Sequence, residues 1–184
     1  MSADAIGKAM PPRVGLTDLA EMNAVDRHGH RYETSPEGML SVMPPPDSDH
    51  AGIASELFAW FIMAGWLPRQ ILQAAGIRIT GPDGDGGRIP DLTVWSKPQP
   101  SSVWLPITEL LLVIEIVSAG SKSMDRDTKR FEYAEAGIPR YWVVDRDTAQ
   151  TVTLHHLGSD GIYEVGAKMP LAWLLRTEPS ERLG

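Results

Sequence analysis

Apolar residues recur at helical spacing in three segments of the chain. The clearest segment spans residues 49–64, where one helix face collects Ile53, Leu57, Trp60, Phe61 and Ala64. A shorter helix is expected to start from an N-cap at Thr17. A third covers residues 124–137, where Gly137 suits the end of a helix. The pattern therefore predicts three helices separated by long stretches of extended chain.

The segments between these helices are short, rich in apolar and β-branched residues, and typical of strands. Four such strands are expected, at residues 70–80, 88–96, 111–117 and 138–145, and a polar loop is expected at residues 118–123. Two hairpins are also expected, with turns at residues 35–38 and 159–161. The glycine-rich residues 83–87 suit a turn or flexible loop and lack the lysine of a phosphate-binding loop.

The order helix, strand, strand, strand, helix, strand, with a hairpin on each side, predicts one mixed sheet in an α/β or α+β fold. The 184 residues, 42% of them hydrophobic, suffice for one domain with a sizeable core. We expect a mobile leader at residues 1–16 and a single domain at residues 17–184.

The amino-acid composition of the chain excludes several kinds of site and of protein. There are no cysteines, which excludes disulfides, thiolate metal sites and a cysteine nucleophile. No apolar stretch is long enough for a membrane span or a signal peptide, so cytoplasmic location is the expectation. The net charge of −7 argues against broad coating of nucleic acid. A local nucleic-acid site is still compatible with this charge, because residues 119–141 hold five basic and four acidic residues and so are not acidic as a segment.

Glu115 lies in the most hydrophobic predicted strand, where both faces are expected to be buried. Burying an unpaired carboxylate costs several kcal/mol, on the order of the whole stability of a small domain. A metal ion, a cationic side chain or a proton could compensate this charge.

Asp91 and Lys129 complete a candidate constellation with Glu115. Asp91 follows Pro90 in the predicted strand before that of Glu115, so the two carboxylates can converge at one end of the sheet if these strands pair. Carboxylate oxygens suit Mg²⁺ or Mn²⁺, which keep several waters and take one or two carboxylates. Lys129, in the next helix, could orient a metal-bound water.

The segments "IPDLTVW", "LLVIEIVSAGSKSMDRDTKRFEYAEAGIPRYWVVD" and "HRYE…SDH" resemble the Uma-two family of restriction-endonuclease-like proteins, within the PD-(D/E)XK nuclease superfamily. The resemblance covers residues 17–165 and is most specific over residues 115–145. It implies a restriction-endonuclease-like fold and Mg²⁺- or Mn²⁺-dependent hydrolysis of nucleic acid, expected to be DNA. It also implies that Asp91 and Glu115 bind the metal and that Lys129 assists catalysis.

The chain departs from the superfamily pattern at Val117, where the usual lysine would stand two residues after the second acid. The family resembled here moves this lysine to the following helix, and Lys129 fills that place. The hairpin around Glu33 is also less regular than the family pattern, which leaves the role of Glu33 open.

Several alternatives remain open at this point. Accessory roles at the site are assigned to Glu33, Glu56, His50 and Ser118, each of which could instead be structural or solvated. Glu115 could form a buried ion pair without metal, and the fold could serve as an inactive nucleic-acid or protein binding module, or as a metal-free structural protein. A homodimer is also left open, and no membrane partner is expected.

Overall fold

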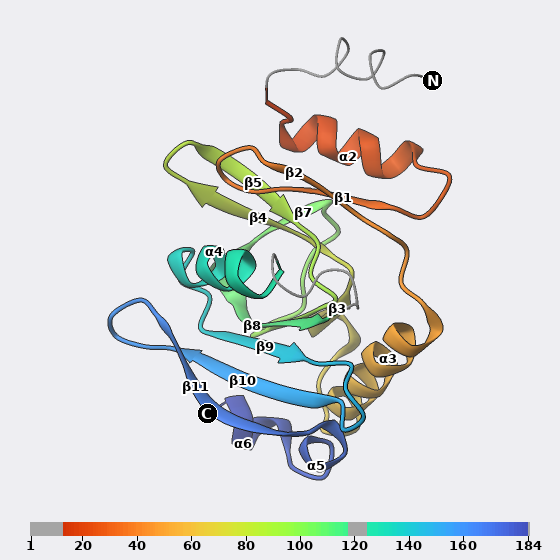
Figure 1. The fold of residues 1–184 in the computed structure, drawn as a ribbon, viewed down its shortest axis with the longest axis vertical. Helices are drawn as coiled ribbons and strands as arrows, with labels where there is room; N and C mark the ends of the chain where they lie inside the picture. Colours follow the sequence, from red (N-terminus) through yellow and green to blue (C-terminus); the bar gives the residue numbers. More distant parts are fainter. Residues whose placement is uncertain (1–12, 118–124, 184) are drawn as a thin grey trace.

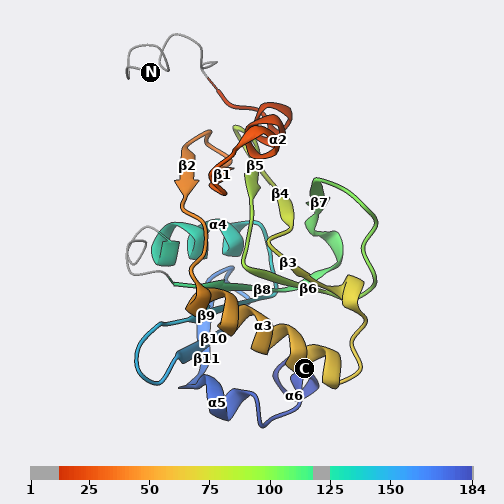
Figure 2. The same ribbon diagram turned by 90° about the vertical axis from the view of Figure 1, so that its right-hand side faces the viewer.

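The computed structural model describes residues 13–117 and 125–183, which form two β-sheets and several helices (Figures 1 and 2). The smaller sheet has five strands, in the spatial order β2 (Leu40–Met43), β1 (Arg31–Thr34), β5 (Gly84–Arg88), β4 (Gly76–Gly81) and β7 (Trp104–Pro106). The larger sheet has six, in the order β11 (Tyr163–Pro170), β10 (Thr151–Leu157), β9 (Arg140–Val144), β8 (Leu110–Ile116), β6 (Leu92–Trp95) and β3 (Ile71–Gln73). The fold is α+β, as expected, but the strands divide into two mixed sheets.

Helices lie on both faces of the larger sheet, and the first described helix lies against the smaller sheet instead (Figure 2). They are α2 (Leu16–Val25), α3 (Ser48–Met63), α4 (Arg130–Glu135), α5 (Leu171–Leu174) and α6 (Pro179–Leu183). Helix α3 lies on one face of the larger sheet, whereas α4 lies on the opposite face, between the two sheets. None of the described helices is both long enough and apolar enough to cross a membrane.

Alternate side chains of β8 enter two separate cores, because successive residues of a strand point to opposite faces. Ile114 packs with Leu57 of α3 and with Trp142 of β9. On the other face, Val113 packs with Tyr133 of α4 and with residues of the smaller sheet. Glu115 shares the second face, so its carboxylate lies between the two sheets.

The expected strand at residues 70–80 is in fact two strands in different sheets, β3 and β4. Ala74 lies between them with φ of +50°, a left-handed conformation that redirects the chain. Its amide donates a hydrogen bond to the carbonyl of Asp91, 3.1 Å away. The expectation of one continuous strand was wrong because the left-handed position of this turn is occupied by an alanine rather than by a glycine.

Residues 83–87 were expected to be a loop, but most of them belong to β5. Their glycines permit close packing: a Cβ on Gly86 would lie 2.6 Å from the Pro36 nitrogen, and one on Gly87 would lie 2.7 Å from Leu19 Cδ2. The absent side chains therefore let the first hairpin and α2 approach this strand. The segment expected as strand 88–96 is divided accordingly, with its first residue ending β5 and β6 starting only at position 92.

Other boundaries also differ from expectation. Helix α2 is capped at Gly15 rather than at Thr17, and α3 is capped by Asp47, whose carboxylate accepts from the His50 amide. Both expected hairpins are present.

Of the expected leader, residues 1–12 lie outside the described residues, whereas Val14 is buried. The expected polar loop at residues 118–123 also lies outside them. Helices α5 and α6 had not been expected.

Candidate active site

The pairing of β6 with β8 brings Asp91 and Glu115 together. These strands are antiparallel, with Leu92 opposite Ile114. Continuing this register by one residue places Asp91, just before β6, opposite Glu115. The Ile116 amide donates a 2.8 Å hydrogen bond to Asp91 Oδ2, which fixes the aspartate against β8. The expected convergence of these two residues at the end of adjacent strands is therefore present.

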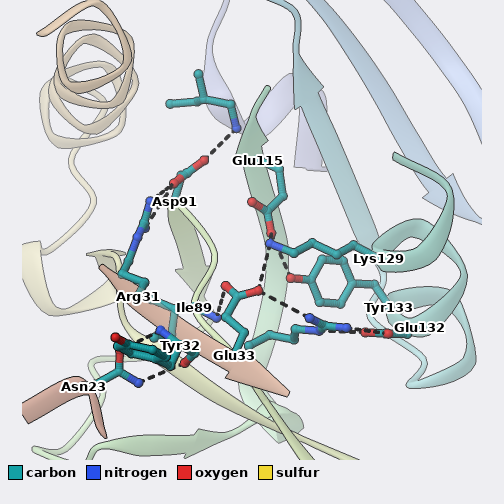
Figure 3. A network of polar contacts seen from close by, with 12 residues as sticks. Asn23, Arg31, Tyr32, Glu33, Ile89, Asp91, Glu115, Lys129, Glu132 and Tyr133 are labelled. Atoms are coloured by element: carbon teal, nitrogen blue, oxygen red, sulfur yellow. Dashed lines mark hydrogen bonds and ion pairs between the residues drawn. The ribbon is translucent and has the colours of Figure 1, made fainter. Parts of the chain in front are cut away.

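Glu115 is buried, and one of its oxygens is held by two groups from the chain after β8 (Figure 3). Lys129 Nζ lies 3.1 Å from Glu115 Oε1, and the Tyr133 hydroxyl donates to the same oxygen over 2.9 Å. Among the described residues, no group donates to the other oxygen, Oε2. The Tyr133 ring is buried in the core, and its hydroxyl also belongs to the site.

Asp91 has a more crowded environment. Nη1 and Nη2 of Arg31 each lie 3.2 Å from Asp91 Oδ1, and His50 Nε2 lies 3.0 Å from the same oxygen. Arg31 comes from β1 and His50 from the first turn of α3, so three separate parts of the chain meet at this carboxylate.

The two carboxyl groups have opposite pKa shifts. Burial raises the pKa of Asp91, but the hydrogen bond and charge of His50, the charge of Arg31 and the Ile116 amide together bring it below its usual value. Burial raises the pKa of Glu115 to about 7, and the charges of Asp91 and Glu33 add to this rise against the lowering effect of Lys129. Such a separation is common where two acidic groups have different chemical tasks.

Lys129 is the last residue of a π-helical turn, Asp125–Lys129, that leads into α4. Its ammonium group bridges two carboxylates, because Nζ also lies 3.2 Å from Glu33 Oε2. Val117, at the superfamily's usual lysine position, is buried in the core between the sheets. The lysine therefore reaches the second acid from the helix, as the resemblance implied.

Glu33 is itself anchored by the smaller sheet. Its Oε1 accepts from the Ile89 amide over 2.9 Å, and its Oε2 lies 3.4 Å from Arg88 Nη1. Arg88 also donates to both carboxylate oxygens of Glu132 in α4, over 2.8 and 2.5 Å. Ion pairs thus link Lys129 to Glu33, Glu33 to Arg88, and Arg88 to Glu132. Glu132 lies three residues after Lys129, so these contacts tie the start of α4 to the smaller sheet.

A pocket of about 130 Å³ connects these groups. Its charged or polar lining includes Arg31, Glu33, Asp47, His50, Asp91, Glu115, Lys129 and Arg146, and Pro44, Pro45 and Pro46 contribute to its apolar wall. At about 30 Å³ per water, this space holds about four waters. A larger cavity of about 550 Å³, beside β9, β10 and α6, has none of these residues in its wall.

Of the four accessory residues expected, the structure brings two to the pocket. Glu33 and His50 line it, whereas Glu56 is exposed on α3 and is not part of its lining. Ser118 lies outside the described residues. Sequence analysis missed Arg31 and Arg88, because a sequence separation of 60 residues from Asp91 and of 44 from Glu132 gives no local pattern.

The donor set at this pocket fits a hard divalent cation. Asp91 and Glu115 offer two carboxylates, which is as many as Mg²⁺ usually takes beside its waters. Glu115 Oε2 is free of donors within the described residues. Burial, together with the charges of Asp91 and Glu33, raises the pKa of Glu115, and a bound cation would oppose this rise. Within residues 13–117 and 125–183, no group of three or more histidine or acidic side chains is arranged to hold a metal ion. Water would therefore have to complete the coordination.

Comparisons with known proteins agree with this architecture. The chain is similar to the crystal structure of a putative nuclease belonging to DUF820 from Anabaena variabilis ATCC 29413, with a TM-score of 0.58 and 21% sequence identity. That match covers 75% of this chain and 78% of the other, and it supports the fold. A comparison with curated proteins gives no match. The Uma2 family model, described as "Putative restriction endonuclease", matches residues 16–179, so the chain belongs to the Uma2 family.

Proposed function

We propose that this protein is a Mg²⁺- or Mn²⁺-dependent nuclease that hydrolyses phosphodiester bonds of DNA. The observation that carries the proposal is the meeting of Asp91, Glu115 and Lys129 at one buried pocket. Membership of a family described as "Putative restriction endonuclease" and the likeness to the structure of a "putative nuclease" support the same reaction class.

Asp91 and Glu115 would hold the metal, through Glu115 Oε2 and one oxygen of Asp91. The bound ion would supply Lewis-acid polarisation of the phosphate and a lowered pKa for its water. Asp91 already carries negative charge at neutral pH, since its pKa is lowered. Glu115 must lose its proton to act as a ligand, and a nearby cation favours that loss.

Lys129 would orient the attacking water and stabilise charge on the phosphate in the transition state. Its Nζ is placed by Glu33 Oε2 and Glu115 Oε1, at 3.2 and 3.1 Å. A lysine on a flexible stem needs such fixed partners, because catalysis by electrostatic stabilisation depends on groups that are already in position. Glu33 thus acts as a positioning residue rather than a metal ligand in this proposal.

Cleavage assays test the proposal. Purified protein is incubated with plasmid DNA, single-stranded DNA and RNA in Mg²⁺, Mn²⁺ or EDTA, beside Asp91→Ala, Glu115→Ala and Lys129→Met. Glu56→Gln is the matched control, because Glu56 is an exposed acidic residue outside the pocket. We expect metal-dependent DNA cleavage that the three site variants lose and the control keeps. Equal cleavage by all variants, or none on any substrate, would contradict it.

A binding module without catalysis is the second candidate. It is favoured by the ion pairs that already surround Asp91, since Arg31 and His50 compensate its charge without a metal. Val117, where the superfamily's usual lysine would stand, and the acidic net charge also motivate a role without catalysis. Tight DNA binding that is unchanged by Mn²⁺ and gives no product would support this second function over the first.

A further inference from the structure

Arg31 is the least satisfied cation in the pocket. Both of its Nη atoms donate to one oxygen, Asp91 Oδ1, over 3.2 Å each. Its Nε is buried and has no hydrogen-bond partner within the described part of the chain. A guanidinium group has five N–H donors in a planar fork. Pairing with a single oxygen therefore leaves most of the hydrogen-bonding capacity of Arg31 unused.

Arg88 shows what a structural arginine looks like in this protein. It donates to both oxygens of Glu132 and to Glu33, and only 4% of its side chain is exposed. Arg31 has 20% of its side chain exposed and lines the pocket. The contrast indicates that Arg31 is held less firmly and can reach a molecule that enters the pocket.

Metal binding at Asp91 would place two further positive charges beside Arg31. Asp91 Oδ1 already accepts from Arg31 and from His50. An arginine stays charged in proteins. Repulsion can therefore be relieved at Arg31 only by movement of its side chain away from Asp91.

We propose that Arg31 binds phosphate, and that its guanidinium stays paired with Asp91 until a divalent cation binds the Asp91 carboxylate. The released guanidinium then binds a backbone phosphate of the nucleic acid, for which its planar fork is suited. This inference rests on the proposed function, because it assumes that Asp91 is a metal ligand and that nucleic acid is the substrate. It assigns to Arg31 a substrate contact that the metal-free structure hides.

The first test needs no metal. Affinity for a fluorescently labelled single-stranded DNA oligonucleotide is measured by anisotropy in EDTA for wild type, Asp91→Asn, Arg31→Ala and the double variant. Asp91→Asn removes the charge that holds Arg31, so we expect DNA affinity to rise about tenfold, a gain of the size that charge-assisted phosphate contacts give. Arg31→Ala should abolish this gain in the double variant.

Two outcomes of this first test overturn the proposal. A gain that persists in the double variant would show that Asp91→Asn acts only by reducing negative charge. No gain in Asp91→Asn would show that the released arginine does not bind phosphate. Circular dichroism verifies folding, and Asp91→Ser replaces Asp91→Asn if the latter is unfolded. Arg78→Ala is the matched control, because Arg78 is an exposed arginine of β4 outside the pocket.

The second test measures Mn²⁺ affinity by calorimetry. Removal of a competing cation should make Arg31→Ala bind Mn²⁺ about tenfold more tightly than wild type, while Arg31→Lys and Arg78→Ala change little. Weaker Mn²⁺ binding by Arg31→Ala would overturn the proposal and make Arg31 a structural support for Asp91. A wild-type protein that binds no Mn²⁺ would contradict the proposed function itself, whereas the metal-free test would still decide whether Arg31 binds phosphate.

Discussion

At the scale of single residues, Glu115 is compensated by a lysine, a tyrosine hydroxyl and a raised pKa. Lys129 and Tyr133 both contact Oε1, yet the pKa of Glu115 still rises to about 7. Burial is the largest cause of this rise, and the neighbouring negative charges of Asp91 and Glu33 add to it. In the metal-free site, ionised Glu115 is therefore destabilised by burial and by repulsion from Asp91 and Glu33. Such a loss of stability is expected of a site that is preorganised for function.

Glu115→Gln should stabilise the metal-free protein at pH 8. The amide keeps an oxygen acceptor for Lys129 and Tyr133 but removes a buried charge beside Asp91. We expect the free energy of unfolding to rise by about 1 kcal/mol, the value of about one pKa unit of differential interaction. Chemical denaturation in EDTA measures it. A loss of more than about 1 kcal/mol, typical of a broken hydrogen bond, would make Glu115 a structural anchor instead.

The same shift predicts a pH dependence. The pKa of Glu115 rises from 4.5 to about 7 on folding, so the folded state binds more protons between these values. The free energy of unfolding of wild type should therefore fall, relative to Glu115→Gln, as pH rises from 4.5 to 7 and then level off. Denaturation of both proteins in EDTA across this window checks the sign. A constant difference would contradict the raised pKa.

Lys129→Met should destabilise the metal-free protein. Lys129 pairs with both Glu33 and Glu115, and removal of one partner from a buried ion pair costs about 3–5 kcal/mol. The double variant Glu115→Gln, Lys129→Met should lose less than the sum of the two single changes, because one of the unpaired charges is gone. Melts of the three variants in EDTA measure this coupling. Additive effects would mean that Lys129 and Glu115 do not interact.

The residue-scale site could be predicted only in part. Asp91 could be predicted from its place near the end of a strand, and Glu115 from its charge in an apolar strand. Lys129 could be predicted from the family resemblance. Arg31 and Arg88 could not be predicted, because their partners lie 60 and 44 residues away. Their contacts depend on how the two sheets pack, which no local spacing records.

At the scale of elements, β8 and β9 were predictable because they are continuous apolar runs buried on both faces. The strand β5 was not, since glycines weaken strands and usually mark turns. In this protein Gly86 and Gly87 are required by packing, because they lie against the first hairpin, α2 and the Trp104 ring. Gly84, at the start of β5, has instead a φ of +135°, which favours glycine. Sequence alone gives no indication of such close approaches.

Gly86→Ala should therefore destabilise the protein. Its new Cβ would lie 2.6 to 2.8 Å from backbone atoms of the turn and strand at residues 34–36, which cannot shift as a side chain end can. We expect a loss of about 1–3 kcal/mol, the usual cost of overpacking. Gly52→Ala is the matched control, because nothing lies within 4 Å of a Cβ there and alanine favours the helix by up to about 1 kcal/mol. Thermal melts that show equal effects would contradict this packing.

At the scale of the whole molecule, the site is assembled from both sheets and from the helix between them (Figure 3). Arg31 and Glu33 come from the smaller sheet, Glu115 from the larger one, Asp91 from the residue just before β6, and Lys129 from the turn before α4. The net charge of −7 leaves this local group of cations, rather than the overall charge, to attract nucleic acid. The packing of the sheets thus determines whether the site exists.

Anomalous diffraction from a crystal soaked in Mn²⁺ tests the central claim most directly. We predict one anomalous peak between Glu115 Oε2 and Asp91, about 2.1 Å from each ligand oxygen, near the Mg²⁺ distance, with Arg31 turned away from Asp91. The same soak of Glu115→Ala should show no peak there. Absence of a peak in wild type, with Asp91 still paired to Arg31 and Glu115 to Lys129, would contradict a metal-dependent site.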